Sequence, residues 1–211
     1  MDYASFLTLV HRRRSPYAFD PESDISDADL GRVFEAARWA PSSYNEQPWR
    51  VLVGRRGDAA YAAIQGALRG RNPEWATTAP VLGLVLTSET FARSGKPNAH
   101  RRYDAGAAMM AAALAAETLG LGLHLMAGVD AGAAADRLGV PRGFDALAGF
   151  ALGRPAADPA AVVPGDLAER AGAPKSRRPL AETVFSTWGE PLLPEVALPA
   201  ASQDVRTVDQ P

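Results

Sequence analysis

The chain has 211 residues, of which 47% are hydrophobic and 22% are charged, as in an ordinary globular protein with a sizeable core. The formal net charge of -2 gives no overall basic field, so the composition argues against nucleic acid as a partner. The absence of cysteine excludes disulfides, thiolate metal sites and a cysteine nucleophile, and it favours a cytoplasmic location.

Neither a metal site nor a membrane segment is expected. The three histidines, His11, His100 and His124, lie too far apart in sequence to suggest metal ligands. The N-terminus lacks the basic and then apolar pattern of a signal peptide. The apolar stretch 106–125 is rich in Ala and Gly and carries Glu117, which favours a core helix over a membrane span.

Apolar periodicity predicts a series of helices and strands in the first half of the chain. A short helix over 3–11 precedes a run of arginines, and a second helix over 27–39 has Ser26 as its N-cap with Asp29 three residues on. The remaining elements are a strand over 49–53 closed by Gly54, a helix over 58–68 and a buried strand over 81–87.

The second half is expected to contain a long helix covered by small residues. This helix spans 104–119, where Ala and Gly let neighbouring elements approach closely, so it belongs at the centre of the molecule or in a subunit contact. An extended piece over 123–127, a helix over 131–138, a strand over 144–153 and a strand-like 183–185 complete the pattern. Without regular βαβ alternation, the fold class is α+β.

A polar loop stands between the second helix and the first strand, over residues 40–49. Pro41 and Pro48 end the helix and stiffen the loop. The loop also offers the hydroxyls and amides of Ser42, Ser43, Asn45 and Gln47, which are groups that orient a ligand without adding charge. An ordinary polar turn is the alternative interpretation.

Two basic clusters, residues 12–15 and 175–178, each combine Arg or Lys with a serine. Guanidinium forks and a hydroxyl suit a phosphate monoester, whereas the alternative is two solvated surface charge runs. Neither a Rossmann nor a Walker glycine loop is present, nor is a GxSxG elbow. Asn72 follows a helix pattern, where asparagine commonly caps or turns.

These motifs, taken in order, resemble the nitroreductase family of flavin enzymes. The segments that carry the resemblance are Arg13-Arg14-Ser15 with Phe19, residues 35–43, Asn45 with Gln47-Pro48-Trp49, Asn72 ahead of Ala79-Pro80, Gly120-Leu121-Gly122, Gly128-Val129-Asp130, residues 152–155, and Lys175-Ser176-Arg177. They run across residues 6 to about 188. The resemblance therefore covers nearly the whole chain.

The resemblance implies a three-layer α+β fold, with a central mixed or antiparallel sheet flanked by helices, that forms an intertwined homodimer. One FMN-binding domain would span residues 1–188, and residues 189–211 would form a Pro-rich tail that is extended or disordered. FMN would occupy two sites at the subunit interface. NADH or NADPH would be the co-substrate.

The resemblance also implies which side chains touch FMN. Arg13, Arg14, Ser15, Lys175 and Arg177 would hold the phosphate; Pro41, Ser42 and Ser43 of the partner subunit would reach the isoalloxazine, with Asn45 and Gln47 close by; Asn72 would meet the polar edge of the ring; and Gly128, beside Ala127, would bring a backbone amide to the reactive ring nitrogen. A residue without a side chain at Gly128 would leave one flavin face open.

The chain departs from the family pattern at two of these positions. Tyr17 stands where relatives often carry Arg or Lys, and Ala127 stands where many bacterial nitroreductases have an acidic residue. The first departure removes a cation that could stabilise reduced flavin. It predicts a flavin that is harder to reduce, unless Arg69 or Arg71 takes the place of that cation.

The expected function is an FMN-dependent oxidoreductase that passes reducing equivalents from NAD(P)H to a nitroaromatic, quinone or other flat electron-poor acceptor by a ping-pong mechanism. No catalytic side chain is expected, because the flavin carries the chemistry. One alternative is another chemistry within the family: enone reduction, dehalogenation, azoline oxidation or flavin breakdown. Others are a flavin-binding protein for storage or sensing, and an interaction protein with unused basic patches.

Overall fold

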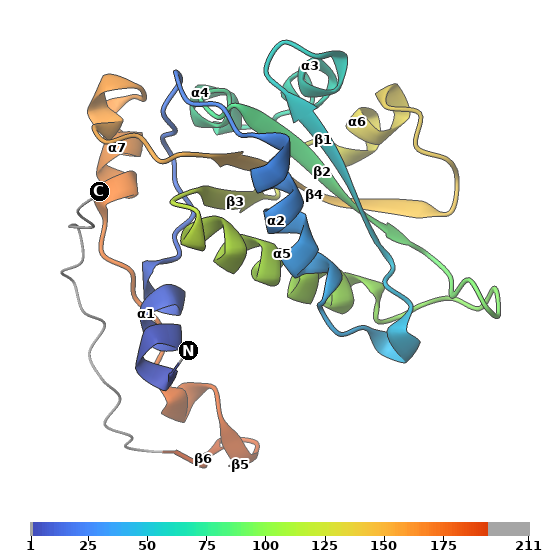
Figure 1. Cartoon of the computed structure of the whole chain (residues 1–211). Helices are drawn as coiled ribbons and strands as arrows, with labels where there is room; N and C mark the ends of the chain where they lie inside the picture. Colours follow the sequence, from blue (N-terminus) through green and yellow to red (C-terminus); the bar gives the residue numbers. More distant parts are fainter. Residues whose placement is uncertain (1, 194–211) are drawn as a thin grey trace.

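The computed structural model describes residues 2–193, and a four-stranded antiparallel sheet lies at its centre (Figure 1). The strands follow the order β1-β2-β4-β3 across the sheet. Their bounds are Trp49–Arg55 (β1), Val81–Ser88 (β2), Gly122–Met126 (β3) and Phe144–Gly153 (β4).

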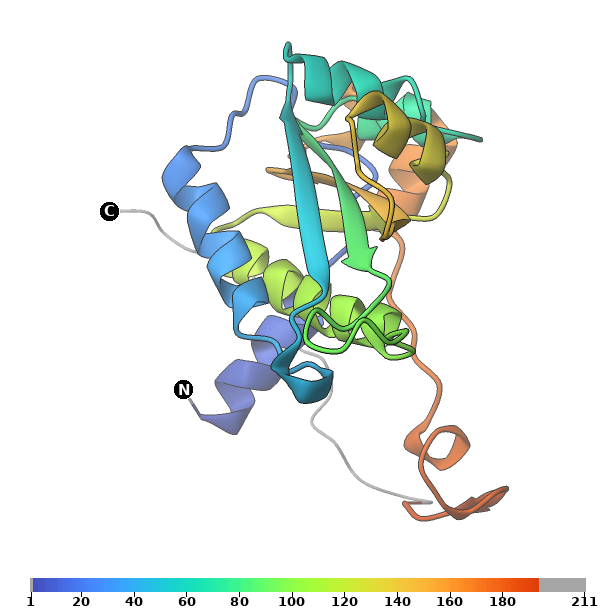
Figure 2. The same cartoon turned by 90° about the vertical axis from the view of Figure 1, so that its right-hand side faces the viewer.

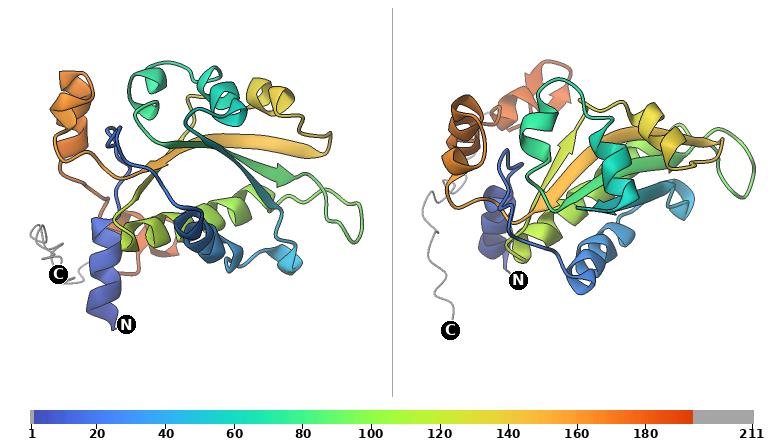
Figure 3. Two further views of the ribbon diagram at one scale, coloured as in Figure 1. Left: turned by 45° about the horizontal axis from the view of Figure 1, so that its top comes forward. Right: turned by 90° about the horizontal axis from the view of Figure 1, so that it is seen from above.

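Helices cover both faces of this sheet and make three layers (Figure 3). One face carries α2 (Asp27–Arg38) and α5 (Arg101–Thr118). The other face carries α3 (Ala59–Gln65), α4 (Asn72–Ala76) and α6 (Ala131–Arg137). The expected α+β class with an antiparallel sheet flanked by helices is therefore confirmed.

The central strands are buried on both sides because each face has its own hydrophobic core. In β2, Leu82, Leu84 and Leu86 pack into the core on the α3 side, whereas Val81 and Val85 pack into the core on the α5 side. Alternation of side chains along a strand explains the division. Gly83 pairs with Phe150 of β4, and a Cβ on Gly83 would lie 1.9 Å from the Phe150 ring, so only glycine makes room for that ring.

Several elements lie outside the three layers. They are α1 (Tyr3–Arg12), α7 (Gly165–Gly172), the 3-10 helices η1 (Ser43–Asn45), η2 (Pro159–Ala161) and η3 (Leu180–Glu182), and a hairpin of β5 (Phe185–Thr187) and β6 (Glu190–Pro191). Figure 2 shows α1 and this hairpin standing away from the sheet. Large side chains such as Tyr3 and Trp188 are exposed there.

The expected helices and strands of the three layers are confirmed within a few residues, and Ser26 caps α2 by accepting a hydrogen bond from the Asp29 amide at 3.1 Å. Gly54 does not close β1, because the strand continues to Arg55. Residues 183–185 are not a strand of their own, since η3 ends at Glu182 and β5 begins at Phe185. Helix α7 is not foreseen in its Pro- and Ala-rich setting.

The expected tail over 189–211 lies mostly outside the described residues, which end at 193 and include β6. Within residues 2–193, no helix combines the length and the apolarity that a membrane crossing needs.

Candidate functional site

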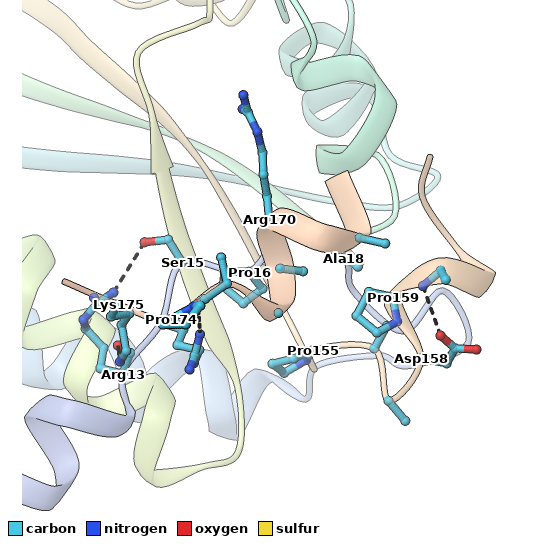
Figure 4. Close-up of a pocket in the computed structure, with 18 of the residues that line it drawn as sticks. Arg13, Ser15, Pro16, Ala18, Pro155, Asp158, Pro159, Arg170, Pro174 and Lys175 are labelled. Carbon is cyan, nitrogen blue, oxygen red and sulfur yellow. Dashed lines mark hydrogen bonds between the residues drawn. The ribbon is translucent and has the colours of Figure 1, made fainter. Parts of the chain in front are cut away.

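The two basic clusters converge on one pocket, although about 160 residues separate them in sequence. The pocket has a volume of about 630 Å³, and Arg13, Arg14, Ser15, Lys175 and Arg177 contribute to its lining. Figure 4 shows Arg13, Ser15 and Lys175 together at one end of this pocket, with Asp158 and Pro159 at the other. The structure therefore brings together all five residues that were expected to hold a phosphate.

Backbone carbonyls fix the positions of these cations. Lys175 donates through Nζ to the carbonyl of Arg13 at 2.8 Å and also to the carbonyl of His11. Arg14 Nη1 donates to the carbonyl of Ala173 at 3.1 Å, and Arg13 Nη1 lies 3.4 Å from Ser15 Oγ. The end of α1 and the chain that follows α7 are thus held side by side.

The cluster carries more positive charge than its surroundings balance. Burial, followed by the neighbouring Arg14, Arg13 and Arg177, lowers the pKa of Lys175 to about 8. Burial and Arg177 also lower the pKa of Arg13. Glu117, which pairs with Arg12 at 3.2 Å, is the nearby carboxylate, and burial raises its pKa. An anion bound among these cations would relieve their mutual repulsion.

A second group of expected residues meets beside the end of β3. Asn72 Nδ2 donates to the carbonyl of Gly128 at 2.7 Å, and the amide of Arg69 donates to the same carbonyl at 2.8 Å. A Cβ on Gly128 would lie 2.5 Å from Asn72 Nδ2, so this close approach requires glycine, and Ala127 precedes it. Asn72 is not a helix cap, because it is the first residue of α4 and Arg71 is the N-cap.

Tyr17 joins this second group through aromatic contacts. Its ring packs edge-on against Trp75, with centroids 5.3 Å apart, and against His124, with centroids 4.8 Å apart. Trp75 is buried, and its indole Nε1 donates to Asn72 Oδ1 at 3.1 Å. Tyr17, Asn72 and Gly128 are thereby connected, and we call the set of Tyr17, Asn72, Trp75, His124 and Gly128 the ring-edge group.

Tyr17 stands where relatives often carry a cation, and neither Arg69 nor Arg71 is available to replace that cation. Arg69 pairs with Asp130 at 3.0 Å. Arg71 pairs with Glu74 at 2.8 Å and with Asp166, and its hydrogen bonds to these carboxylates raise its pKa. Both guanidinium groups are already neutralised by carboxylates, so the ring-edge group has no unpaired arginine beside it from this segment.

The loop that carries Pro41, Ser42, Ser43, Asn45 and Gln47 lies elsewhere, at the opposite end of the sheet from α1 and α7 (Figure 1). Its backbone is strained, because Tyr44, Asn45 and Gln47 have φ values of 54°, 55° and 50°. Within one chain, the structure does not bring this loop to the basic pocket or to the ring-edge group.

Two of the hydrogen bonds in the strained loop run from a backbone amide to a side-chain acceptor. The Gln47 amide donates to Ser42 Oγ at 2.9 Å, and the Ser43 amide donates to Asp104 Oδ2 at 3.1 Å. Asp104 lies in the first turn of α5 and is only 4% exposed. These hydrogen bonds tie the loop to α5 and to its own start.

Sequence reasoning missed four residues that organise these groups: Trp75, His124, Asp104 and Glu117. The spacing of Asn72 and Trp75, three residues apart on one helix, was a signal that they could touch. The contacts of His124, Asp104 and Glu117 join residues that are 61 or more positions apart, and periodicity carries no signal for them.

Comparison with known proteins bears on the family and the fold. The model of the Nitroreductase family matches residues 10–74 and 65–154. A crystal structure described as an oxidoreductase containing FMN is 35% identical, with a TM-score of 0.78 over 84% of this chain and 89% of that chain. A Desulfovibrio desulfuricans protein, proposed to be a nitroreductase and solved in complex with FMN, is 28% identical, with a TM-score of 0.68 over 86% of this chain and 95% of that chain.

Among curated proteins, a Streptomyces coelicolor relative is 33% identical over 78 residues, which is 37% of this chain. Its name proposes an NADH dehydrogenase or NAD(P)H nitroreductase. The match spans 38% of that relative, so it covers well under half of the relative's length.

Proposed function

The chain belongs to the nitroreductase family, and from that premise we propose that it is an FMN-dependent oxidoreductase. It would take reducing equivalents from NADH or NADPH and pass them to a nitroaromatic, quinone or other flat electron-poor acceptor by a ping-pong mechanism. The protein would act as a homodimer with two FMN sites, each built from both chains.

The observation that carries this proposal is the convergence of Arg13, Arg14, Ser15, Lys175 and Arg177 on one pocket. Four cations and a hydroxyl fit a phosphate monoester, because they supply charge-assisted donors to several oxygens at once. The lowered pKa of Lys175, about 8, supports an anion as the ligand of this pocket. The ring-edge group fits the other end of the same cofactor.

In this proposal each group of residues has one task. The basic pocket binds the phosphate, and Asn72 meets the polar edge of the ring system. Gly128 allows close backbone approach, which a Cβ would prevent by crowding Asn72. Ser42 and Ser43 come from the partner subunit, which agrees with the distant position of their loop within one chain (Figure 1).

Bound FMN would supply hydride-transfer chemistry in both half-reactions. The protein then needs no nucleophile or general base of its own. Its residues bind the cofactor, orient it and leave space for one flat ligand at a time, and solvent can provide protons.

Anaerobic reduction of the purified protein reconstituted with FMN tests the proposal. We expect NADPH or NADH to bleach the visible flavin band, and a quinone or nitro compound to restore it. Failure of both pyridine nucleotides to bleach a bound flavin would favour a storage or sensing role. Failure to bind FMN at all would remove the flavin proposal altogether.

A further inference from the structure

Two hydrogen-bond partners determine which way the side-chain amide of Asn72 is turned. An indole N–H can only donate, so the Asn72 atom that faces Trp75 Nε1 at 3.1 Å is the carbonyl oxygen Oδ1. The carbonyl of Gly128 can only accept, so the atom that faces it at 2.7 Å is the nitrogen Nδ2. A flipped amide would lose both hydrogen bonds.

Trp75 is itself held in place by two aromatic side chains. His124 stacks on the indole with centroids 4.3 Å apart and planes 25° apart, and the Tyr17 ring makes a T-shaped contact with the indole. His124 Nδ1 lies 2.8 Å from the carbonyl of Pro16, so Nδ1 carries the hydrogen. Burial lowers the pKa of His124, which favours the neutral form of the stacked ring.

These contacts form one connected path from Pro16, which follows the first basic cluster, to Gly128. The path runs from Pro16 to His124, then to Trp75, Asn72 and Gly128. Trp75 is buried and His124 and Asn72 are half-buried, so the path lies beneath the surface that the ring-edge group presents. Among residues 2–193, these two hydrogen bonds leave Asn72 with one side-chain N–H and one carbonyl lone pair unused.

We propose that Trp75 and His124 are positioning residues that fix the direction of the Asn72 amide, so that Asn72 presents one donor and one acceptor to the polar edge of the flavin ring. That edge alternates carbonyl oxygens with an N–H, and it needs both kinds of partner. The inference rests on the proposed FMN-dependent function and adds two residues that act through Asn72.

A double-mutant cycle tests whether Trp75 acts through Asn72. Trp75→Phe keeps an aromatic ring against His124 but removes the donor to Asn72 together with part of the buried ring, and the cycle separates the two effects. We expect this variant to bind riboflavin, which carries the ring without the phosphate, about fivefold more weakly, the loss of about one neutral hydrogen bond. In an Asn72→Ala background, the same change should have no further effect on the dissociation constant measured by flavin fluorescence.

Equal effects of Trp75→Phe in both backgrounds would mean that Trp75 contributes packing alone, and would overturn the inference. If Trp75→Phe does not fold, His124→Asn provides the cycle, because its amide can still donate to the Pro16 carbonyl while the stack on Trp75 is lost. Wild-type protein that binds neither FMN nor riboflavin would overturn the proposed function as well. Wild-type binding without coupling would overturn only this inference.

Discussion

Lys175 lines the basic pocket and has a lowered pKa. Its pKa is about 8, below the ordinary value of 10.5, because of burial and the nearby arginines. A phosphate monoester remains a dianion from pH 7 to 9, so the lysine is the titrating partner in this range. FMN affinity should fall about tenfold between pH 7 and pH 9, since one pH unit above the pKa nine-tenths of the free lysines are neutral. Equilibrium dialysis across this range measures the effect.

Lys175→Arg is the matched control, because a guanidinium stays charged throughout this range. The FMN affinity of this variant should not vary between pH 7 and pH 9. An equally steep loss of affinity in the arginine variant would assign the titration to another group.

Tyr17 predicts a flavin that is hard to reduce. It occupies the position of an expected cation, and Arg69 and Arg71 are paired with carboxylates. Tyr17→Lys should raise the midpoint potential of bound FMN by roughly 30 mV, equivalent to about 1.4 kcal/mol for a two-electron couple. The physical reason is that a cation stabilises the negative charge gained on reduction. Potentiometric titration measures this shift.

Tyr17→Gln separates the effect of charge from the loss of the aromatic contacts with Trp75 and His124. An unchanged potential in Tyr17→Lys, or an equal rise in Tyr17→Gln, would remove the electrostatic explanation.

At the scale of elements, the contact between α3 and β1 depends on a glycine within the strand. A Cβ on Gly54 would lie 2.2 Å from the backbone nitrogen of Tyr61, and backbone cannot move aside cheaply. Gly54→Ala should lower the free energy of unfolding by about 1–3 kcal/mol, as overpacking does. Urea denaturation monitored by circular dichroism measures the change.

Gly31, in the interior of α2, is the matched position, because a Cβ there meets nothing within 4 Å. Gly31→Ala should raise the free energy of unfolding by about 0.5–1 kcal/mol through helix propensity. Destabilisation of the same size at both positions would contradict the packing argument.

The loop between α2 and β1 depends on Asp104 of α5. Asp104→Ala leaves the half-buried amide of Ser43 without its acceptor and should cost about 1–3 kcal/mol of unfolding free energy, measured in urea. Asp104→Asn keeps a carbonyl oxygen for the Ser43 amide and should retain most of the stability. Equal losses in the two variants would show that the charge at the start of α5 matters more than the hydrogen bond.

Sequence patterns predicted the elements of the three layers other than α4, because their apolar residues recur with clear periods and their ends carry caps such as Ser26. Helix α7 escaped prediction since Ala, Gly and Pro dominate its surroundings and Leu167 is its only buried residue. The basic pocket could be expected from two Arg-rich motifs. The stacking of His124 on Trp75 could not, because it depends on how β3 and α4 meet in space.

At the scale of the whole molecule, the expected flavin site is divided between two places on the folded subunit. The basic pocket lies on one side of it, and the loop over 40–49 lies on the opposite side (Figure 1). The surface also exposes large aromatic side chains, including Trp39 at 75%, Tyr44 at 92% and Trp188 at 95%. Exposed aromatics of this size are typical of surfaces that another chain covers. Both observations support our proposal that two copies complete each site.

Complementation between two defective chains tests this central claim most directly. One chain carries Arg13→Ala with Arg177→Ala, which damages the phosphate pocket, and the other carries Ser42→Ala with Ser43→Ala, which damages the loop. Each homodimer then has two defective sites. The purified heterodimer has one intact site if the loop serves the partner, and none if the loop serves its own chain.

The measurement is the number of tight FMN sites per heterodimer, determined by equilibrium dialysis. Our account predicts one tight site, bleached by the same pyridine nucleotide as the wild-type protein, while neither homodimer binds FMN tightly. A heterodimer with no tight site, together with a wild-type dimer with two, would contradict it.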